Sequence, residues 1–174
     1  MIYVSTSTIP QRIKNLDKSI KSLLNQTKKP DKIFINIPFK YKRFSETIKD
    51  DEIPKFDGSV VEITRCEDCG PATKLLGSLN KLEKNSLVIL FDDDHVYEDY
   101  MIEKFFYFYS KSPNNAYSFY VHPLGNFGIG QGADGFAINT NHLKGINNFY
   151  DKVVKDYKEL FLYDDLWISY FLYF

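Results

Sequence analysis

The sequence has little cysteine, and its basic and acidic residues nearly cancel. Among 174 residues there are two cysteines, Cys66 and Cys69, which form a single C-x-x-C. A structural zinc site needs further ligands, and the three histidines, His95, His122 and His142, are scattered. We therefore interpret the cysteines as reduced thiols in a turn, with a redox pair or a disulfide as the alternative. With 22 basic and 23 acidic residues the chain lacks the positive excess typical of general nucleic-acid binders, so no nucleic-acid partner is expected.

Long apolar segments are also missing. The first five residues lack the basic and apolar regions of a signal peptide, and no run approaches the ~20 apolar residues of a membrane span. These absences predict a cytoplasmic protein without a transmembrane segment. The chain nevertheless ends in an apolar run from Leu166 to Phe174. Such an end is typical of a chain truncated from a longer, multidomain protein, and a membrane or partner surface is the alternative.

Aromatic residues, by contrast, are abundant. The chain is 44% hydrophobic and 17% aromatic, with 13 Tyr and 15 Phe, which excludes global disorder. Its length is that of one domain with a substantial core. Since no internal repeat is visible, we predict a single domain over residues 1–174.

The order of apolar patterns along the chain predicts an α/β fold. Strands are expected at residues 1–5, 32–37, 59–64, 86–91, 116–121 and 135–139. Helices are expected at residues 13–24, 70–82, 102–109, 148–160 and 165–174, with a long loop at 38–58 and a glycine-rich segment at 125–132. Alternation of strands and helices in the first half implies right-handed βαβ units. The prediction is a mostly parallel central sheet flanked by helices.

The most informative motif follows the apolar strand predicted at residues 86–91. This strand leads directly into Asp92, Asp93 and Asp94. An unbroken aliphatic run is typical of a parallel strand buried on both faces, and ligands of open α/β sheets bind beyond the carboxyl ends of such strands. Clustered carboxylates hold Mg²⁺ or Mn²⁺, usually beside substrate phosphates. We therefore predict a Mn²⁺ or Mg²⁺ site here; capping of the next helix is the alternative, although one Asp would suffice for it.

Several further motifs, in the same order, resemble the nucleotide-sugar glycosyltransferases of the GT-A fold. The resemblance is carried by residues 5–12 (STSTIPQR), 19–31, 92–94 as a D-x-D motif, 132–137 (GADGFA) and 164–167 (DDLW). It spans essentially the whole chain and implies a Rossmann-like GT-A domain. The implied activity is metal-dependent transfer of a sugar, most often from a UDP-sugar, to a glycan or other hydroxyl acceptor. Many metal-dependent relatives carry a further His ligand after the last acidic motif, and this chain stops at Phe174 without one.

The resemblance also implies roles for the three adjacent aspartates. Asp94 corresponds to the metal ligand, and Asp92 would reach the ribose hydroxyls or the metal. Asp93 is expected to turn away from substrate, because alternate side chains on an extended segment point apart. Its expected partner is a nearby basic side chain or a helix end.

Donor-binding roles are expected for polar residues near the ends of the first strands. Ser5 and Thr6 would contact the nucleoside and phosphates, and Arg12 offers a forked donor suited to phosphate. Asn36 would read the edge of the base. Lys74 would contact phosphate or brace the aspartates. Solvated surface positions are the alternative for Arg12 and Lys74.

The second half of the chain supplies the remaining candidates. Gly132 and Gly135 allow close approach of the backbone to a ligand, and Asp134 between them would hold sugar hydroxyls; a plain tight turn is the alternative. Asp164 and Asp165 are the catalytic candidates, with Asp165 favoured. An inverting transferase needs such a carboxylate as base on the acceptor hydroxyl, whereas a retaining one would use both to bind sugar hydroxyls. A helix N-cap is the structural alternative.

Two other functions remain open from the sequence. A nucleotidyltransferase shares the α/β plan and an acidic metal site, but it usually carries a glycine-rich basic loop after the first strand, and residues 5–10 contain no glycine. A catalytically silent nucleotide- or sugar-binding module would bind without turnover. The sugar, the acceptor and the stereochemistry are left open by the residues.

Overall fold

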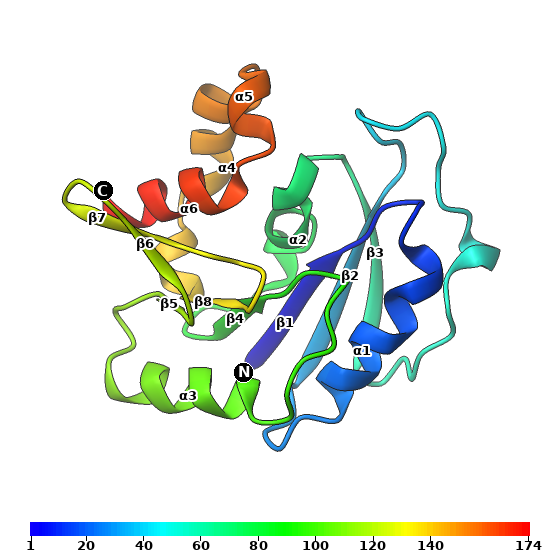
Figure 1. Ribbon diagram of the computed structural model, residues 1–174, viewed down its shortest axis with the longest axis horizontal. Coiled ribbons are helices and arrows are strands. Elements are labelled where there is room, and N and C mark those ends of the chain that lie inside the picture. The colour runs from blue at the N-terminus through cyan, green and yellow to red at the C-terminus, as the bar shows by residue number, and fades with distance from the viewer.

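Six strands form one mixed sheet in the order β3-β2-β1-β4-β8-β5, and the computed structural model describes every residue from 1 to 174 (Figure 1). The strands β1 (Ile2–Ser7), β2 (Lys32–Pro38), β3 (Val61–Cys66) and β4 (Leu87–Leu90) pair in parallel. β8 (Phe136–Asn139) runs antiparallel to both of its neighbours, β4 and β5 (Tyr117–Ser118). The predicted α/β fold with a mostly parallel sheet is confirmed.

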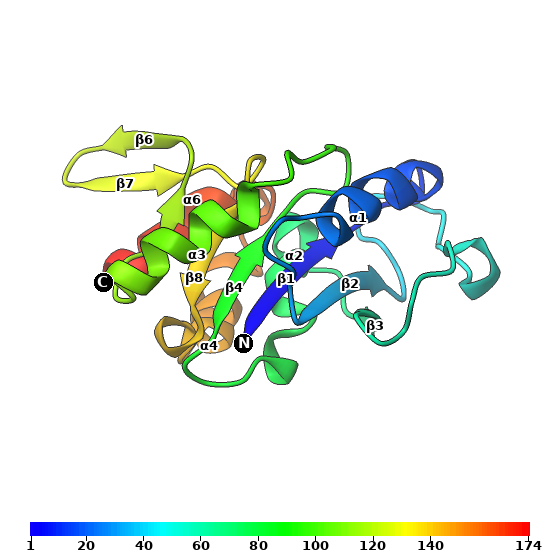
Figure 2. The same cartoon turned by 90° about the horizontal axis from the view of Figure 1, so that it is seen from below.

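Helices cover both faces of this sheet (Figures 1 and 2). One face carries α1 (Leu16–Leu24) and α3 (Met101–Lys111). The other carries α2 (Thr73–Leu76), α4 (Ile146–Phe149), α5 (Lys158–Phe161) and α6 (Asp164–Tyr173). None of these helices combines the length and apolar character needed to cross a membrane.

The hydrophobic core is divided by the sheet into two parts. Successive strand residues point to opposite faces, so Ile2 and Val4 of β1 belong to the cluster that includes α1 and α3, whereas Tyr3 between them belongs to the cluster that includes Trp167 of α6. Every residue of β4 is buried. Burial on both faces explains why β4 reads as an uninterrupted aliphatic run.

The strand order creates a reversal between β1 and β4. The chain lays down β2 and β3 on one side of β1, and then returns to place β4 on the other side. Such a reversal opens a crevice at the carboxyl ends of the two strands, where ligands of α/β proteins bind. At these ends lie Ser7, the last residue of β1, and Thr8 after it, and Asp92 and Asp93 beyond β4.

Two predicted helices are interrupted. Residues 70–82 form a 3₁₀ turn, the short α2 and a second 3₁₀ turn at Leu79–Lys81, with Gly77 between them. A Cβ on Gly77 would come within 2.7 Å of the Asn36 side chain, so the backbone lies directly against β2 there. Residues 148–160 pass from α4 through a π-helical turn, Tyr150–Val154, to an extended Tyr157 before α5 begins. The long loop at 38–58 is irregular, as predicted, except for one 3₁₀ turn at Asp50–Glu52.

The glycine-rich segment contains a hairpin that was not predicted. β6 (Val121–Leu124) and β7 (Phe127–Gly130) pair antiparallel, and only Tyr117 and Ser118 of the strand predicted at 116–121 join the main sheet. Gly125 has φ +59° at the first position of the two-residue turn, a conformation that favours glycine. The hairpin lies along α6 (Figure 1), where the backbone N–H of Gly130 donates to Ser169 Oγ at 3.0 Å.

Candidate functional site

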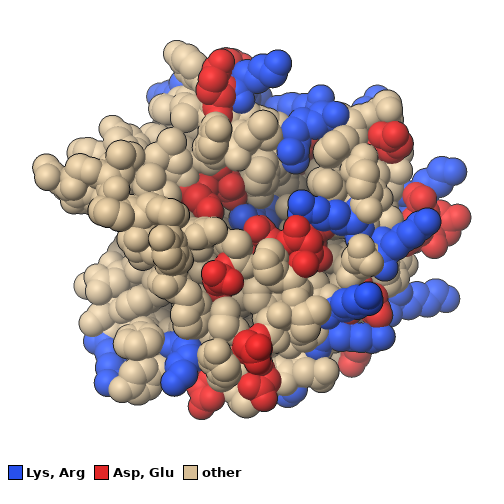
Figure 3. Space-filling view, in the orientation of Figure 1, with Lys and Arg blue, Asp and Glu red and all other residues tan.

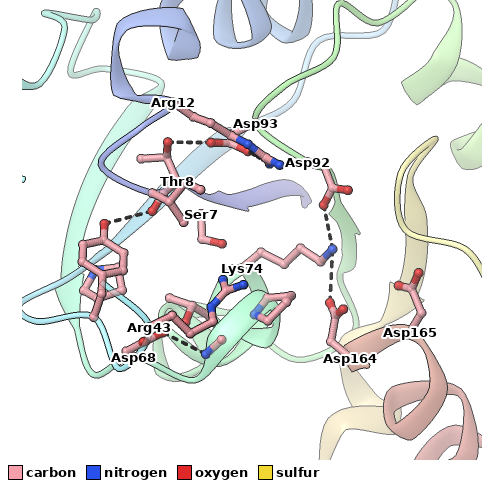
Figure 4. A pocket seen from close by; sticks show the side chains of 16 residues that line it. Ser7, Thr8, Arg12, Arg43, Asp68, Lys74, Asp92, Asp93, Asp164 and Asp165 are labelled. Atoms are coloured by element: carbon pink, nitrogen blue, oxygen red, sulfur yellow. Dashed lines mark hydrogen bonds and ion pairs between the residues drawn. The ribbon is translucent and has the colours of Figure 1, made fainter. Parts of the chain in front are cut away.

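A polar cavity of about 290 Å³ lies at the carboxyl ends of β1 and β4 (Figure 4). Its walls come from the turn after β1, the segment after β2, the start of α2, the segment after β4 and the start of α6. Figure 3 shows acidic and basic side chains gathered around a hollow in the middle of this face, whereas the surface over β6, β7 and the end of α6 has neither. The cavity therefore occupies the crevice that the strand order predicts.

Lys74 links two acidic segments that are far apart in the sequence. Its Nζ lies 2.8 Å from Oδ1 of Asp92 and 3.1 Å from Oδ2 of Asp164, and its side chain is only 6% exposed (Figure 4). Burial by itself lowers the pKa of Lys74, but the charges of Asp164, Asp92 and Asp165 outweigh burial and leave that pKa raised. Two roles are predicted for Lys74, contact with phosphate and bracing of the aspartates. The structure contains the contacts needed for bracing.

Asp93 points into the cavity and is held by Arg12 and Thr8. Thr8 Oγ1 donates to Asp93 Oδ2 at 2.5 Å, and Arg12 Nη1 lies 3.0 Å from Asp93 Oδ1. Burial raises the pKa of Asp93, an effect that the bonds from Thr8 and Arg12 offset only in part. The expected basic partner of Asp93 is therefore Arg12. The orientation of Asp93 differs from the expected one, because it and Asp92 both line the cavity.

Asp94 lies outside this cavity. Its Oδ1 pairs with His95 Nδ1 at 2.8 Å and its Oδ2 with Arg12 Nη1 at 3.0 Å, so both oxygens have cationic or hydrogen-bonding partners. The two predicted metal ligands, Asp92 and Asp94, thus face different surroundings. The pair does not belong to any group of three or more His, Cys, Asp or Glu side chains arranged to hold a metal ion. In this arrangement the donor set does not fit a divalent ion.

Asp165 presents a carboxylate with one free oxygen. The backbone N–H of Gly132 donates to Oδ2 of Asp165 at 3.0 Å, whereas Oδ1 is shielded from solvent and has no hydrogen-bond partner. Burial, together with the negative charge of Asp164, raises the pKa of Asp165 to about 6. Tyr163 stands at the N-cap position of α6 and no side chain caps the helix, so neither aspartate serves as the cap. Asp164 and Asp165 both line the cavity.

Three residues that were expected to bind the sugar donor lie beneath the cavity floor. Ser5, Thr6 and Asn36 are fully buried. Asn36 Nδ2 donates to Ser5 Oγ at 2.9 Å, to the Thr6 carbonyl at 3.0 Å and to the Lys74 carbonyl at 3.2 Å. These residues tie β1, β2 and α2 together. They do not reach the cavity because β1 continues to Ser7, two residues beyond its predicted end.

The glycine-rich segment contributes Gly132 but not Asp134 to this cavity. Gly132 packs so closely that a Cβ there would lie 2.7 Å from Asp165 Oδ1 and 3.1 Å from Lys74 Nζ. Asp134 is exposed and borders a separate depression beside Tyr97 and Phe119. The structure thus brings Arg12, Lys74, Asp92, Asp164 and Asp165 together around the cavity, which Gly132 adjoins.

Several lining residues were not predicted from the sequence. Asp68 accepts backbone hydrogen bonds from Lys42 at 2.6 Å and from Gly70 at 2.8 Å, and Arg43 stands exposed at the mouth of the cavity. An Asp two residues before Gly70-Pro71, just after a strand, is a signal for this turn that could have been used. Arg43 belongs to the irregular loop at 38–58, where no periodic pattern in the sequence indicates which side chains face the cavity.

Comparisons with known proteins show a likeness in structure only. No protein-family model matches the chain, and no curated protein matches it in sequence. Among solved structures, 2-C-methyl-D-erythritol 4-phosphate cytidylyltransferase from Francisella tularensis has a TM-score of 0.59 at 13% identity, covering 91% of this chain and 82% of that chain. The mannosyltransferase PcManGT from Pyrobaculum calidifontis, in complex with GDP-Man and Mn²⁺, has a TM-score of 0.59 at 11% identity, covering 83% and 46%. S. aureus TarS, residues 1–349 in complex with UDP, has a TM-score of 0.55 at 12% identity, covering 84% and 48%.

At these identities the likeness concerns the fold. The chain has a GT-A-like α/β fold, which confirms that part of the predicted resemblance. The chain spans about half the length of the PcManGT and TarS chains.

Proposed function

We propose that this protein is a glycosyltransferase that binds a nucleoside diphosphate sugar in the cavity and transfers the sugar to a hydroxyl acceptor. The observation that carries the proposal is the Asp165 carboxylate, whose Oδ2 is fixed by Gly132 while Oδ1 stays unpartnered beside a cavity that also contains guanidinium groups. The fold shared with PcManGT, which binds GDP-Man, and with TarS, which binds UDP, supports this class of donor.

The proposed reaction uses Asp165 as the general base. The acceptor hydroxyl donates its hydrogen bond to Oδ1, and its oxygen attacks the anomeric carbon of the donor sugar. As that bond forms, the bond from the anomeric carbon to the diphosphate oxygen breaks, and Asp165 takes the hydroxyl proton. The nucleoside diphosphate leaves with the electron pair. A base with a pKa of about 6 is deprotonated at neutral pH and still accepts a proton effectively. A base on the acceptor implies inversion at the anomeric carbon.

The donor diphosphate is assigned to the opposite, basic part of the cavity. Arg12 keeps 44% of its side chain exposed while it holds Asp93 and Asp94, and Arg43 is exposed at the mouth. A guanidinium presents paired donors that match phosphate oxygens. Ser7 and Thr8, rather than Ser5 and Thr6, supply the turn that faces the phosphates. The proposed reaction uses no divalent ion, because Lys74 and Arg12 already engage the predicted ligands Asp92 and Asp94.

Thermal denaturation with a panel of nucleoside diphosphates and sugar nucleotides tests the proposal. The panel is measured in buffer that contains both Mg²⁺ and Mn²⁺, so that a metal requirement does not hide binding. A ligand at 100 times its Kd adds about 2.7 kcal/mol of stability, which raises the Tm of a chain of this size by roughly 5–10 °C. We expect one nucleotide family to give this shift and its sugar nucleotide to release free nucleoside diphosphate with an acceptor. No shift from any member would contradict the proposal.

A second candidate function is nucleotidyl transfer. It is favoured by the cytidylyltransferase from Francisella tularensis, which this chain matches over 82% of that chain's length. The same panel, extended to nucleoside triphosphates, separates the two. A nucleotidyltransferase would bind the triphosphate and release pyrophosphate, whereas a glycosyltransferase releases nucleoside diphosphate. Affinity without release of either product would indicate the silent binding module.

A further inference from the structure

The ammonium group of Lys74 stands at the meeting point of three carboxylates. Asp92 follows β4, and Asp164 and Asp165 begin α6, so the three come from opposite walls of the cavity. Nζ contacts Asp92 at 2.8 Å and Asp164 at 3.1 Å (Figure 4). Asp165 Oδ1 and Lys74 Nζ both lie within 3.1 Å of the position that a Cβ on Gly132 would take. Without a cation here, three negative charges would face one another in a largely buried space.

Carboxylates that converge on one cation are also found around protein-bound divalent ions, but here the cation is the Lys74 ammonium. Mg²⁺ binds carboxylate oxygens at about 2.0–2.1 Å, and it is commonly held by one or two carboxylates next to substrate phosphates. Lys74 occupies the position from which such an ion would reach Asp92 and Asp164 at once. The other predicted ligand, Asp94, has both oxygens engaged by His95 and Arg12.

The backbone fixes the position of Lys74. The residue lies in α2, whose entry begins with the buried Gly70, and the Lys74 carbonyl accepts a hydrogen bond from Asn36 Nδ2 at 3.2 Å. Its side chain is 6% exposed and crosses the cavity floor toward Asp92. A buried lysine held at both ends is a built part of the site and differs from a surface lysine that happens to find a carboxylate.

We propose that the Lys74 ammonium takes the place of the divalent cation among Asp92, Asp164 and Asp165, so that the nucleotide binds without a divalent ion. That nucleotide binds without a divalent ion rests on the proposed function. That Lys74 replaces a divalent cation among the three carboxylates does not depend on any substrate. Lys74 then serves as a positioning residue for the carboxylates, and the diphosphate charge is met by Arg12 and Arg43.

The first experiment measures Mn²⁺ binding directly, by electron paramagnetic resonance of free Mn²⁺, to the full chain without nucleotide. The wild type, Lys74→Gln and Lys81→Gln are compared. Lys81 is the matched control, because its Nζ also pairs with a carboxylate, that of Glu62, but away from the cavity. We expect Lys74→Gln to bind Mn²⁺ at least tenfold more tightly than the wild type, and Lys81→Gln to equal the wild type. Tight Mn²⁺ binding by the wild type, or no gain in Lys74→Gln, would overturn the inference.

Folding of the variant is followed by thermal denaturation in the same samples. If Lys74→Gln is unstable in chelator, Mn²⁺ is expected to raise its Tm by several degrees while it leaves the Tm of the wild type unchanged. If Lys74→Gln stays unfolded at millimolar Mn²⁺, the result would contradict the inference that a divalent ion can replace the Lys74 ammonium.

The second experiment needs only the wild type. Binding of the nucleotide that the panel identifies is measured by calorimetry with EDTA and with Mn²⁺. Affinities that agree within about threefold support the inference. Binding that appears only with Mn²⁺ overturns it and leaves the proposed function standing. If no nucleotide binds under either condition, the proposed function fails, and the Mn²⁺ measurements alone decide the role of Lys74.

Discussion

The backbone N–H of Gly132 and the Oδ2 atom of Asp165 form a 3.0 Å hydrogen bond that fixes the orientation of this carboxylate. The bond joins the segment after β7 to the first turn of α6, two elements separated by 33 residues. Because Oδ2 is occupied, the solvent-shielded and unpartnered Oδ1 is the oxygen to which the proposed mechanism assigns the acceptor hydroxyl. The close packing of Gly132 against the carboxylate makes this relationship open to a steric test.

Gly132→Ala is expected to displace the Asp165 carboxylate and to lower transfer by about tenfold to a hundredfold, since misplacement by about 1 Å has effects of this size. The new Cβ would lie 2.7 Å from Oδ1, so the side chain has to rotate away. The measurement is kcat with the nucleotide-sugar that the panel identifies. Gly58→Ala is the control, because nothing lies within 4 Å of its added Cβ. Equal rates in the two variants would refute the assigned orientation.

Asp165→Asn is expected to abolish transfer while preserving nucleotide affinity. In the wild type the rate should rise with pH through a midpoint of about 6, because the base acts only when deprotonated. The measurement is the pH dependence of kcat between pH 4.5 and 8. A rate that is flat across this interval, or an active Asp165→Asn, would remove Asp165 from the role of base.

The same substitution is expected to stabilise the protein at alkaline pH. The pKa of Asp165 is about 6 in the folded chain and about 3.9 in the unfolded one, so its contribution to stability is complete below pH 3.9 and is lost as pH rises through 6. At pH 8 the charged carboxylate therefore disfavours folding, and Asn relieves this by about 1–2 kcal/mol. Urea unfolding at pH 8 and at pH 4.5 measures the difference, which should vanish or reverse at the lower pH.

Arg12→Ala is expected to weaken nucleotide binding about tenfold to a hundredfold and to lower stability by about 1–3 kcal/mol, because buried Asp93 is left with Thr8 as its one partner. Calorimetric affinity and urea unfolding give the two values. Lys14→Ala, two residues further on and exposed, controls for loss of positive charge. Arg12→Lys should recover stability better than affinity, since a point charge cannot present the paired donors of a guanidinium. Unchanged affinity in Arg12→Ala would place the phosphates elsewhere.

Asn36→Ala is expected to lower stability by about 1–3 kcal/mol without changing the nucleotide affinity of the folded protein. Its amide holds Ser5, the Thr6 carbonyl and the Lys74 carbonyl, and it is fully buried beneath the cavity. Urea unfolding is compared with Asn15→Ala, at an exposed position. A selective loss of one nucleotide base, with stability intact, would restore the original prediction that Asn36 reads the base.

The cysteine pair is expected to react slowly in the folded state. Burial raises the pKa of Cys66 to about 12 and also raises that of Cys69, so few thiolates exist at pH 8. Alkylation by iodoacetamide at pH 8 should be at least about a hundredfold slower than in urea-unfolded chain. Fast alkylation of the folded protein would favour the redox alternative.

The sheet could be predicted from the sequence, because its strands are buried on both faces and read as short aliphatic runs. β2 at residues 32–38 and β4 at 87–90 fall within two residues of their predicted bounds. The hairpin of β6 and β7 could not be found this way, since most of its residues are exposed and carry no buried pattern. The two-residue turn at Gly125-Asn126 was its one local signal.

The sequence predicts which segments line the cavity, because strand ends and helix starts fix their positions. It does not predict which side chains in the cavity pair with one another. Asp92 is predicted to line the site from its place after a strand, and Asp165 from the resemblance of residues 164–167 to a late acidic motif; both line the cavity. Which of Asp92, Asp93 and Asp94 line the cavity, and which are paired away from it, depends on the basic side chain that contacts each one. Lys74 and Arg12 lie 18 and 81 residues from their partners Asp92 and Asp93, and no local pattern encodes such a pairing.

The hydrogen bonds between the hairpin segment and α6 are spaced equally along both elements. Gly130 and Gly132, two residues apart, donate to Ser169 and Asp165, four residues apart. Two extended residues advance about 6.6 Å and four helical residues about 6.0 Å, so both bonds form together. Between them the N–H of Gln131 points the other way, to the Tyr120 carbonyl. A slip of one residue would turn these N–H groups away from the helix, so the two bonds select one register of the hairpin on α6. The orientation of the Asp165 carboxylate therefore depends on the same register that seats the hairpin on the helix.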